Sequence, residues 1–92
     1  MKYDYFMQIA QCKNISKAAE KLYVSQPSLT KYLKRLEAEL GITLFDRSQM
    51  PLKLTEAGVR FYRYVQTVEE ERKALMADLD EIKHQGRATI TL

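Results

Sequence analysis

Residues 26–34 carry polar side chains of the kinds that can recognise nucleic acid bases. Gln26 lies at the N-terminal tip of a predicted helix, Lys31 and Lys34 lie on its outer face, and Thr30 lies beside them. An amide can pair with an adenine edge, a hydroxyl with any base, and an ammonium group with guanine or phosphate. A helix with these groups on one face suits the major groove of DNA, although an ordinary solvated surface helix has the same polarity.

The opposite face of this helix carries the residues that must hold it in place. Leucines at positions 29, 33, 36 and 40 recur at spacings of four, three and four. At about 100° per residue they form one stripe, which we expect to face the core. Pro27 falls on the polar side, opposite the leucines. Ser25 is expected to cap the helix, and Gly41 to end it.

A first helix is predicted over about residues 3–13. Its apolar residues recur at helical spacing, so Phe6, Ile9 and Ala10 are expected to face inward. Asn14 is expected to end this helix in a left-handed conformation.

A second short helix is predicted over residues 16–22, with Ser16 as its cap and Ile15 folded over its first turn as a hydrophobic staple. The small side chains of Ala18 and Ala19 allow the following helix to cross closely. A tight turn at 23–24 then leads into the polar helix, so the two together read as a helix-turn-helix.

A small hairpin is predicted after the polar helix. Residues 42–45 are β-prone, and the apolar and polar alternation of 52–54 fits a second strand. A hairpin in this position is a wing, and Arg47 at its tip can enter a DNA minor groove. The alternative for Arg47 is an ion pair with Asp46 or a nearby Glu.

The longest predicted element begins at Thr55 and Glu56 and runs to about Gln85, which corresponds to roughly 45 Å of helix. Its seam positions are spaced alternately by four and three residues: Phe61, Val65, Val68, Arg72, Leu75, Leu79 and Ile82. Such a heptad seam predicts pairing with a second helix, and the alternative is packing along its own domain. Arg72 would either pair with an acid of the partner helix, from Glu69 to Glu71, or reach solvent over a packed stem.

Gly86 is expected to end the long helix, and residues 87–92 form a β-prone run. Because a lone strand has no sheet to join, we expect it to open a further domain absent from this sequence. The predicted organisation is residues 1–58 as the helix-turn-helix domain, 59–86 as a linker and dimerisation helix, and 87–92 as the start of the missing domain.

Composition narrows the function further. The net charge is +3, and residues 1–63 hold eleven Lys or Arg against six Asp or Glu, so the basic part carries the predicted helix pair. With one Cys, Cys12, and one His, His84, the sequence predicts no catalytic set, no metal site and no enzyme. The apolar runs are too short for a membrane span and no secretory pattern is present, so we expect a cytoplasmic location.

Five ordered motifs carry a family resemblance. They are ISKAAEKL (15–22), VSQPSLT (24–30), LE with LG (36–37 and 40–41), LFDR (44–47) and LTEAG (54–58). The chain closely resembles the N-terminal DNA-binding region of LysR-type transcriptional regulators. In that family a mainly α, winged helix-turn-helix of three helices and a two-stranded wing joins a long linker helix and a C-terminal effector-binding domain.

The resemblance implies a role for individual residues. The implied base contacts are Gln26, Pro27, Thr30 and Lys31, and the implied DNA-backbone contacts are Ser16, Ser25, Ser28 and Lys34. The implied wing residues are Arg47 and Lys53. Family wings often carry a further Arg after the position of Arg47, whereas this chain has Gln49, Met50 and Pro51, which implies a weaker minor-groove contact.

The resemblance also implies the partners. These are double-stranded DNA and a second copy of the chain through an antiparallel pair of linker helices, with a tetramer in the full-length protein. No cofactor is expected in this segment, and a small-molecule effector is expected in the missing domain. We therefore expect sequence-specific binding to an interrupted inverted repeat by a bacterial transcription regulator. The rival functions are a winged-helix module that docks a protein and a nonspecific architectural DNA binder.

Overall fold

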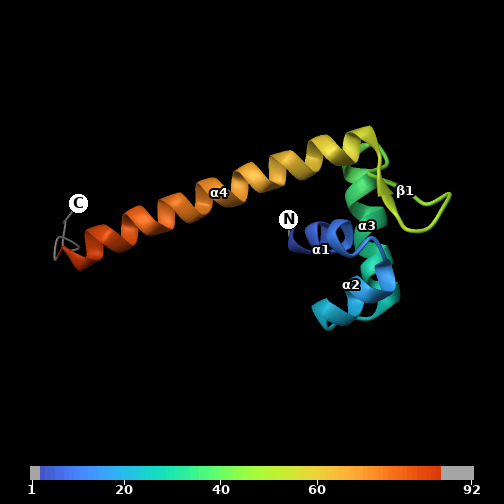
Figure 1. The fold of residues 1–92 in the computed structure, drawn as a ribbon, viewed down its shortest axis with the longest axis horizontal. Helices are drawn as coiled ribbons and strands as arrows, with labels where there is room; N and C mark the ends of the chain where they lie inside the picture. The colour runs from blue at the N-terminus through green and yellow to red at the C-terminus, as the bar shows by residue number, and fades with distance from the viewer. Residues whose placement is uncertain (1–2, 86–92) are drawn as a thin grey trace.

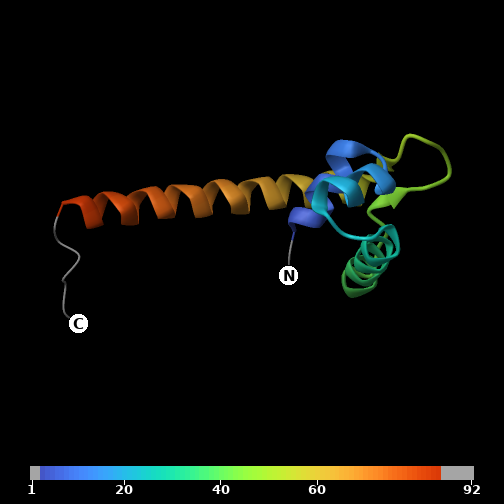
Figure 2. The same ribbon diagram turned by 90° about the horizontal axis from the view of Figure 1, so that it is seen from below.

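The computed structural model describes residues 3–85. Its elements, in chain order, are α1 (Asp4–Cys12), α2 (Ile15–Leu22), α3 (Gln26–Leu40), β1 (Phe45–Asp46), β2 (Lys53–Leu54) and α4 (Glu56–His84). Figure 1 and Figure 2 show α1 to α3 and the hairpin gathered at one end, with α4 projecting away as a long rod. The predicted fold class, a mainly α winged helix-turn-helix followed by a long helix, is confirmed. The predicted stop at Gly86 and strand at 87–92 lie outside the described residues.

One hydrophobic core joins all of these elements except the distal part of α4. Its buried residues are Phe6, Ile9, Ala18, Ala19, Leu29, Leu33, Leu36, Leu44, Phe45, Leu52 and Val65. The leucine stripe of α3 is confirmed at three of its four positions. The prediction is wrong for Leu40, which is 44% exposed, because the last turn of α3 extends past the residues that cover the earlier turns.

The junction between α1 and α2 differs from the prediction. Lys13, with φ of 56°, is the left-handed residue that ends α1. Asn14 caps α2 instead, since its side-chain oxygen accepts a hydrogen bond of 2.9 Å from the Lys17 amide. Asn ranks with Ser among the best capping residues, and the earlier cap takes Ile15 into the helix. Ser16 is therefore not a cap and Ile15 is not a hydrophobic staple.

The start of α4 is fastened to the end of the loop that precedes β1. Thr55 caps α4 as predicted by accepting from the Gly58 amide at 3.0 Å, and its hydroxyl donates to the Thr43 carbonyl at 2.8 Å. The Thr55 amide donates to the Leu44 carbonyl at 2.9 Å. A Cβ at Gly58 would overlap that same Leu44 carbonyl oxygen, so only glycine permits this approach of helix and loop.

Aromatic rings fix the next turns of α4 against α1. The ring of Phe61 lies edge to face with those of Phe6 and Tyr3, at centroid distances of 4.9 and 5.4 Å. Val65, one turn further along, is 5% exposed. Phe61 and Val65 therefore pack against or within the core of their own chain, and the uncovered part of the predicted seam begins at Val68. The predicted boundary between residues 58 and 59 falls inside this helix.

Gly58→Ala is expected to lower the free energy of unfolding by about 1–3 kcal/mol, because the added methyl group forces α4 away from the Leu44 carbonyl. Urea denaturation followed by circular dichroism measures the change. Gly41→Asn is the matched control, since Gly41 has open space around it and Asn tolerates its φ of 73°. Equal stability of Gly58→Ala and the natural chain would contradict the packing argument.

Candidate nucleic-acid interface

The outer face of α3 gathers the residues that were predicted to contact DNA. A shallow groove on this face is lined by Gln26, Pro27, Thr30, Lys31 and Lys34. Thr30 is partly buried and the other four are exposed. The buried leucines on the opposite side of α3 hold these groups outward, so the helix presents an amide, a hydroxyl and two ammonium groups to a partner. Such a set has both the donors and the acceptors that base edges require.

The N-terminus of α3 has an ordered set of hydroxyl groups. The Ser28 amide donates to the Ser25 hydroxyl oxygen at 3.2 Å, which confirms Ser25 as the cap. The Ser25 hydroxyl in turn donates to that of Ser28 at 2.8 Å. Because the proton of the Ser28 hydroxyl is not used in this pair, Ser28 can donate to a phosphate oxygen. Ser16 lies on α2 and donates to the Gln26 side-chain oxygen at 2.8 Å.

A buried carboxylate connects α3 to the hairpin. Glu37 is 8% exposed, and one of its oxygens accepts hydrogen bonds from the Leu44 and Phe45 amides at 2.6 and 3.3 Å. Its other oxygen pairs with the Arg47 guanidinium at 3.2 Å. The sequence analysis missed Glu37 as a structural residue. The available signal was its position four residues after Leu33, which places an acid on the buried stripe.

The hairpin is short and its basic residues lie at its base. In the antiparallel register of the hairpin, Asp46 of β1 lies opposite Lys53 of β2, and Arg47 follows β1 directly. The prediction that Arg47 lies at the tip is therefore wrong. Its side chain is 38% exposed and forms the ion pair with a Glu, here Glu37, that was the alternative. Ser48 donates to the Asp46 carboxylate through its hydroxyl and its amide, and these bonds hold the pKa of Asp46 below its usual value. Lys53 is exposed.

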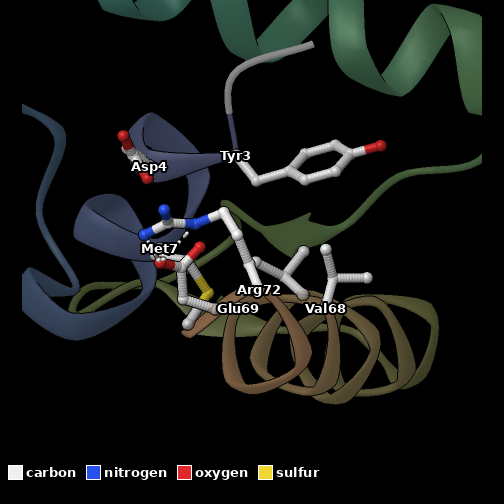
Figure 3. Close-up of a pocket in the computed structure, with 7 residues that line it drawn as sticks. Tyr3, Asp4, Met7, Val68, Glu69 and Arg72 are labelled. Carbon is white, nitrogen blue, oxygen red and sulfur yellow. Dashed lines mark hydrogen bonds and ion pairs between the residues drawn. The ribbon is translucent and has the colours of Figure 1, made fainter. Parts of the chain in front are cut away.

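The distal part of α4 leaves an apolar seam uncovered. Val68, Leu75, Leu79 and Ile82 are between 37% and 54% exposed. Arg72 pairs with Glu69 of the same helix at 2.7 Å, and this hydrogen bond lowers the pKa of the Glu69 carboxyl. Figure 3 shows Val68, Glu69 and Arg72 of α4 beside Tyr3, which precedes α1, and Met7 of α1, and these residues line one pocket.

The fold and the exposed face of α3 define the class of this chain as a winged helix-turn-helix module. Residues 2–59 match the family described as bacterial regulatory helix-turn-helix protein, lysR family. The chain belongs to this LysR family of transcriptional regulators. Within residues 3–85 no helix combines the length and the apolar character needed to span a membrane.

Relatives and solved structures agree with this assignment. The chain is 41% identical over 83 residues to the uncharacterized HTH-type transcriptional regulator YcgK of Bacillus subtilis. This match covers 90% of this chain and 25% of YcgK. It is 42% identical over 60 residues to the HTH-type transcriptional regulator BenM of Acinetobacter baylyi. That match covers 65% of this chain and 20% of BenM. The chain thus spans about a quarter or less of the length of these two curated relatives.

Complexes with DNA are among the similar solved structures. The BenM DNA-binding domain in complex with catB site 1 DNA has a TM-score of 0.83 and 30% identity, covering 95% of this chain and 94% of that chain. The complex of the same domain with benA site 1 DNA has a TM-score of 0.82 and 31% identity, covering 90% and 97%. Full-length BenM has a TM-score of 0.74 and 32% identity, covering 84% of this chain and 26% of that chain.

Glu37→Gln is expected to lower the free energy of unfolding by about 1–3 kcal/mol, because the Arg47 guanidinium loses a charged partner in a largely buried site. Chemical denaturation measures the loss. Glu39→Gln, an exposed neighbour on the same helix, is the control and should leave stability unchanged. In the Arg47→Ala background, Glu37→Gln should lower the free energy of unfolding by less. An undiminished loss would show that the ion pair with Arg47 is not its cause.

Proposed function

We propose that this chain is the DNA-binding module of a bacterial transcription regulator and that α3 enters the major groove of double-stranded DNA. The observation that carries the proposal is the groove lined by Gln26, Pro27, Thr30, Lys31 and Lys34, exposed on the side of α3 that faces away from the core. The similarity to the BenM DNA-binding domain, whose solved complexes contain DNA, supports the same orientation. No catalytic step belongs to this proposal, and binding to a bacterial operator requires a cytoplasmic location.

Roles are proposed for the residues on this face. Gln26, Pro27, Thr30 and Lys31 contact base edges near the N-terminus of α3, where the helix can approach the groove floor. Ser25, Ser28 and Lys34 contact phosphates, and these contacts supply orientation and most of the affinity. The positive end of the α3 dipole adds to the attraction of phosphate.

The wing is proposed to contact the adjacent minor groove mainly through Lys53. Arg47 is ion-paired with Glu37 and its side chain is only 38% exposed, so little of it is available to contact DNA. This division of roles agrees with the loop of Gln49, Met50 and Pro51, which offers no further cation. The minor-groove contact is consequently weak and orients the module without selecting a sequence.

Two copies are proposed to pair through the distal part of α4. Val68, Leu75, Leu79 and Ile82 give a seam at heptad spacing that the described part of the chain leaves uncovered. An antiparallel pair of these helices would place one α3 at each end and so fit an inverted repeat. Assembly of such dimers into tetramers is proposed for the full-length protein.

Lys31→Ala and Gln26→Ala are expected to weaken binding to a selected operator by about 1–3 kcal/mol and to relax the preference at particular base pairs, because each removes a base contact. Fluorescence anisotropy on selected and scrambled duplexes measures both effects. Lys73→Ala on α4 is the charge-matched control and should leave the preference intact. Equal losses on both duplexes would contradict base recognition, and an affinity that does not fall with salt would point to a protein-docking module.

Val68→Asp is expected to convert the dimer into a monomer, because it places a charge in the apolar seam. Analytical ultracentrifugation measures the mass. Val59→Asp is the matched control: Val59 is 39% exposed against 37% for Val68, and lies on the same helix away from the seam. A dimeric mass for Val68→Asp would show that the seam is not the subunit contact.

A further inference from the structure

Ser16 of α2 makes a direct side-chain hydrogen bond to the residue at the tip of α3. Its hydroxyl donates to the Gln26 Oε1 atom at 2.8 Å, across ten residues of sequence. Gln26 lies on the ridge between two hollows: one also contains Ser16 and Asn14, and the other contains Pro27, Thr30 and Lys31. The carbonyl end of the Gln26 amide is thus turned toward α2.

The electrostatics of the site favour this orientation over the reverse one. Ser16 lies in the first turn of α2 and Gln26 is the first residue of α3, so two helix N-termini with positive partial charge converge here. Unpaired backbone amides at helix N-termini attract an acceptor and repel the hydrogens of an amide group. The carbonyl oxygen of Gln26 therefore belongs on the inner side, and its NH₂ group, about 120° away on the same planar carbon, belongs on the other side.

We propose that Ser16 is a positioning residue that makes Gln26 read DNA as a hydrogen-bond donor. This inference rests on the proposed entry of α3 into the major groove. In that groove guanine offers two neighbouring acceptors, O6 and N7, whereas adenine offers one acceptor and one donor. A Gln whose oxygen is held by Ser16 therefore favours guanine, while a Gln free to rotate can pair equally well with adenine. Ser16 then acts on specificity and not as the phosphate contact that the family resemblance implied.

The test is an in vitro selection of bound duplexes by four proteins: the natural chain, Gln26→Ala, Ser16→Ala and Ser16→Thr. Gln26→Ala identifies the base pair that Gln26 reads, as the position at which selectivity disappears. At that pair we expect the natural chain to prefer guanine and Ser16→Ala to reduce the ratio of guanine to adenine about fivefold, the worth of one ordinary hydrogen bond. Ser16→Thr keeps the hydroxyl and should keep the ratio.

Anisotropy titrations on guanine, adenine and scrambled duplexes separate the outcomes. If Ser16→Ala weakens all duplexes equally, Ser16 contacts phosphate and the inference is overturned. An unchanged guanine to adenine ratio in Ser16→Ala also overturns it, while the proposed function stands as long as Gln26→Ala loses selectivity. If the natural chain shows no preference for any duplex, the proposed function itself fails. Thermal denaturation confirms that the Ser16 variants fold.

Discussion

The carboxylate of Glu37 is the interaction on which the geometry of this domain depends. A buried charge is costly unless it is fully paired, and here two backbone amides and the Arg47 guanidinium supply the partners. Those partners all lie within residues 44–47, which are β1 and the residues on either side of it. The requirement to pair Glu37 therefore fixes where the hairpin begins relative to α3, and so fixes the position of a wing beside a recognition helix.

The loop that is hydrogen-bonded to Glu37 also contacts the first turn of α4. Leu44 donates its amide to Glu37, and its carbonyl accepts from the Thr55 amide and lies against Gly58. One residue thus connects α3, the hairpin and α4 through its main chain alone. Close approach at Gly58 and the ring contacts of Phe61 then set the direction of the first turns of α4. The direction of the long helix is set by the same contacts that set the wing.

Sequence reasoning predicts the elements of this fold well and its side-chain partnerships poorly. Periodicity identified the stripe of α3 and the length of α4, and capping chemistry identified Ser25 and Thr55. It failed at Asn14, where two good capping residues compete within three positions, and at Leu40, where periodicity gives no account of how far the neighbouring elements reach. The groove residues of α3 follow from the helical wheel. The Ser16 and Gln26 pair does not, and the ion pair of Arg47 was predicted only as an alternative in which the Glu was not identified as Glu37. Each pair joins residues ten positions apart through a turn.

The packing of Phe61 and Val65 has a mechanical consequence. Because α4 packs against α1 through Phe61 and continues without a break to His84, its distal arm extends directly from the packed domain. The helix has no interruption between residues 56 and 84, so a force on its distal end would act on the whole helix-turn-helix. Displacements of the distal arm thus translate directly into a change of the angle at which α3 is offered to its partner.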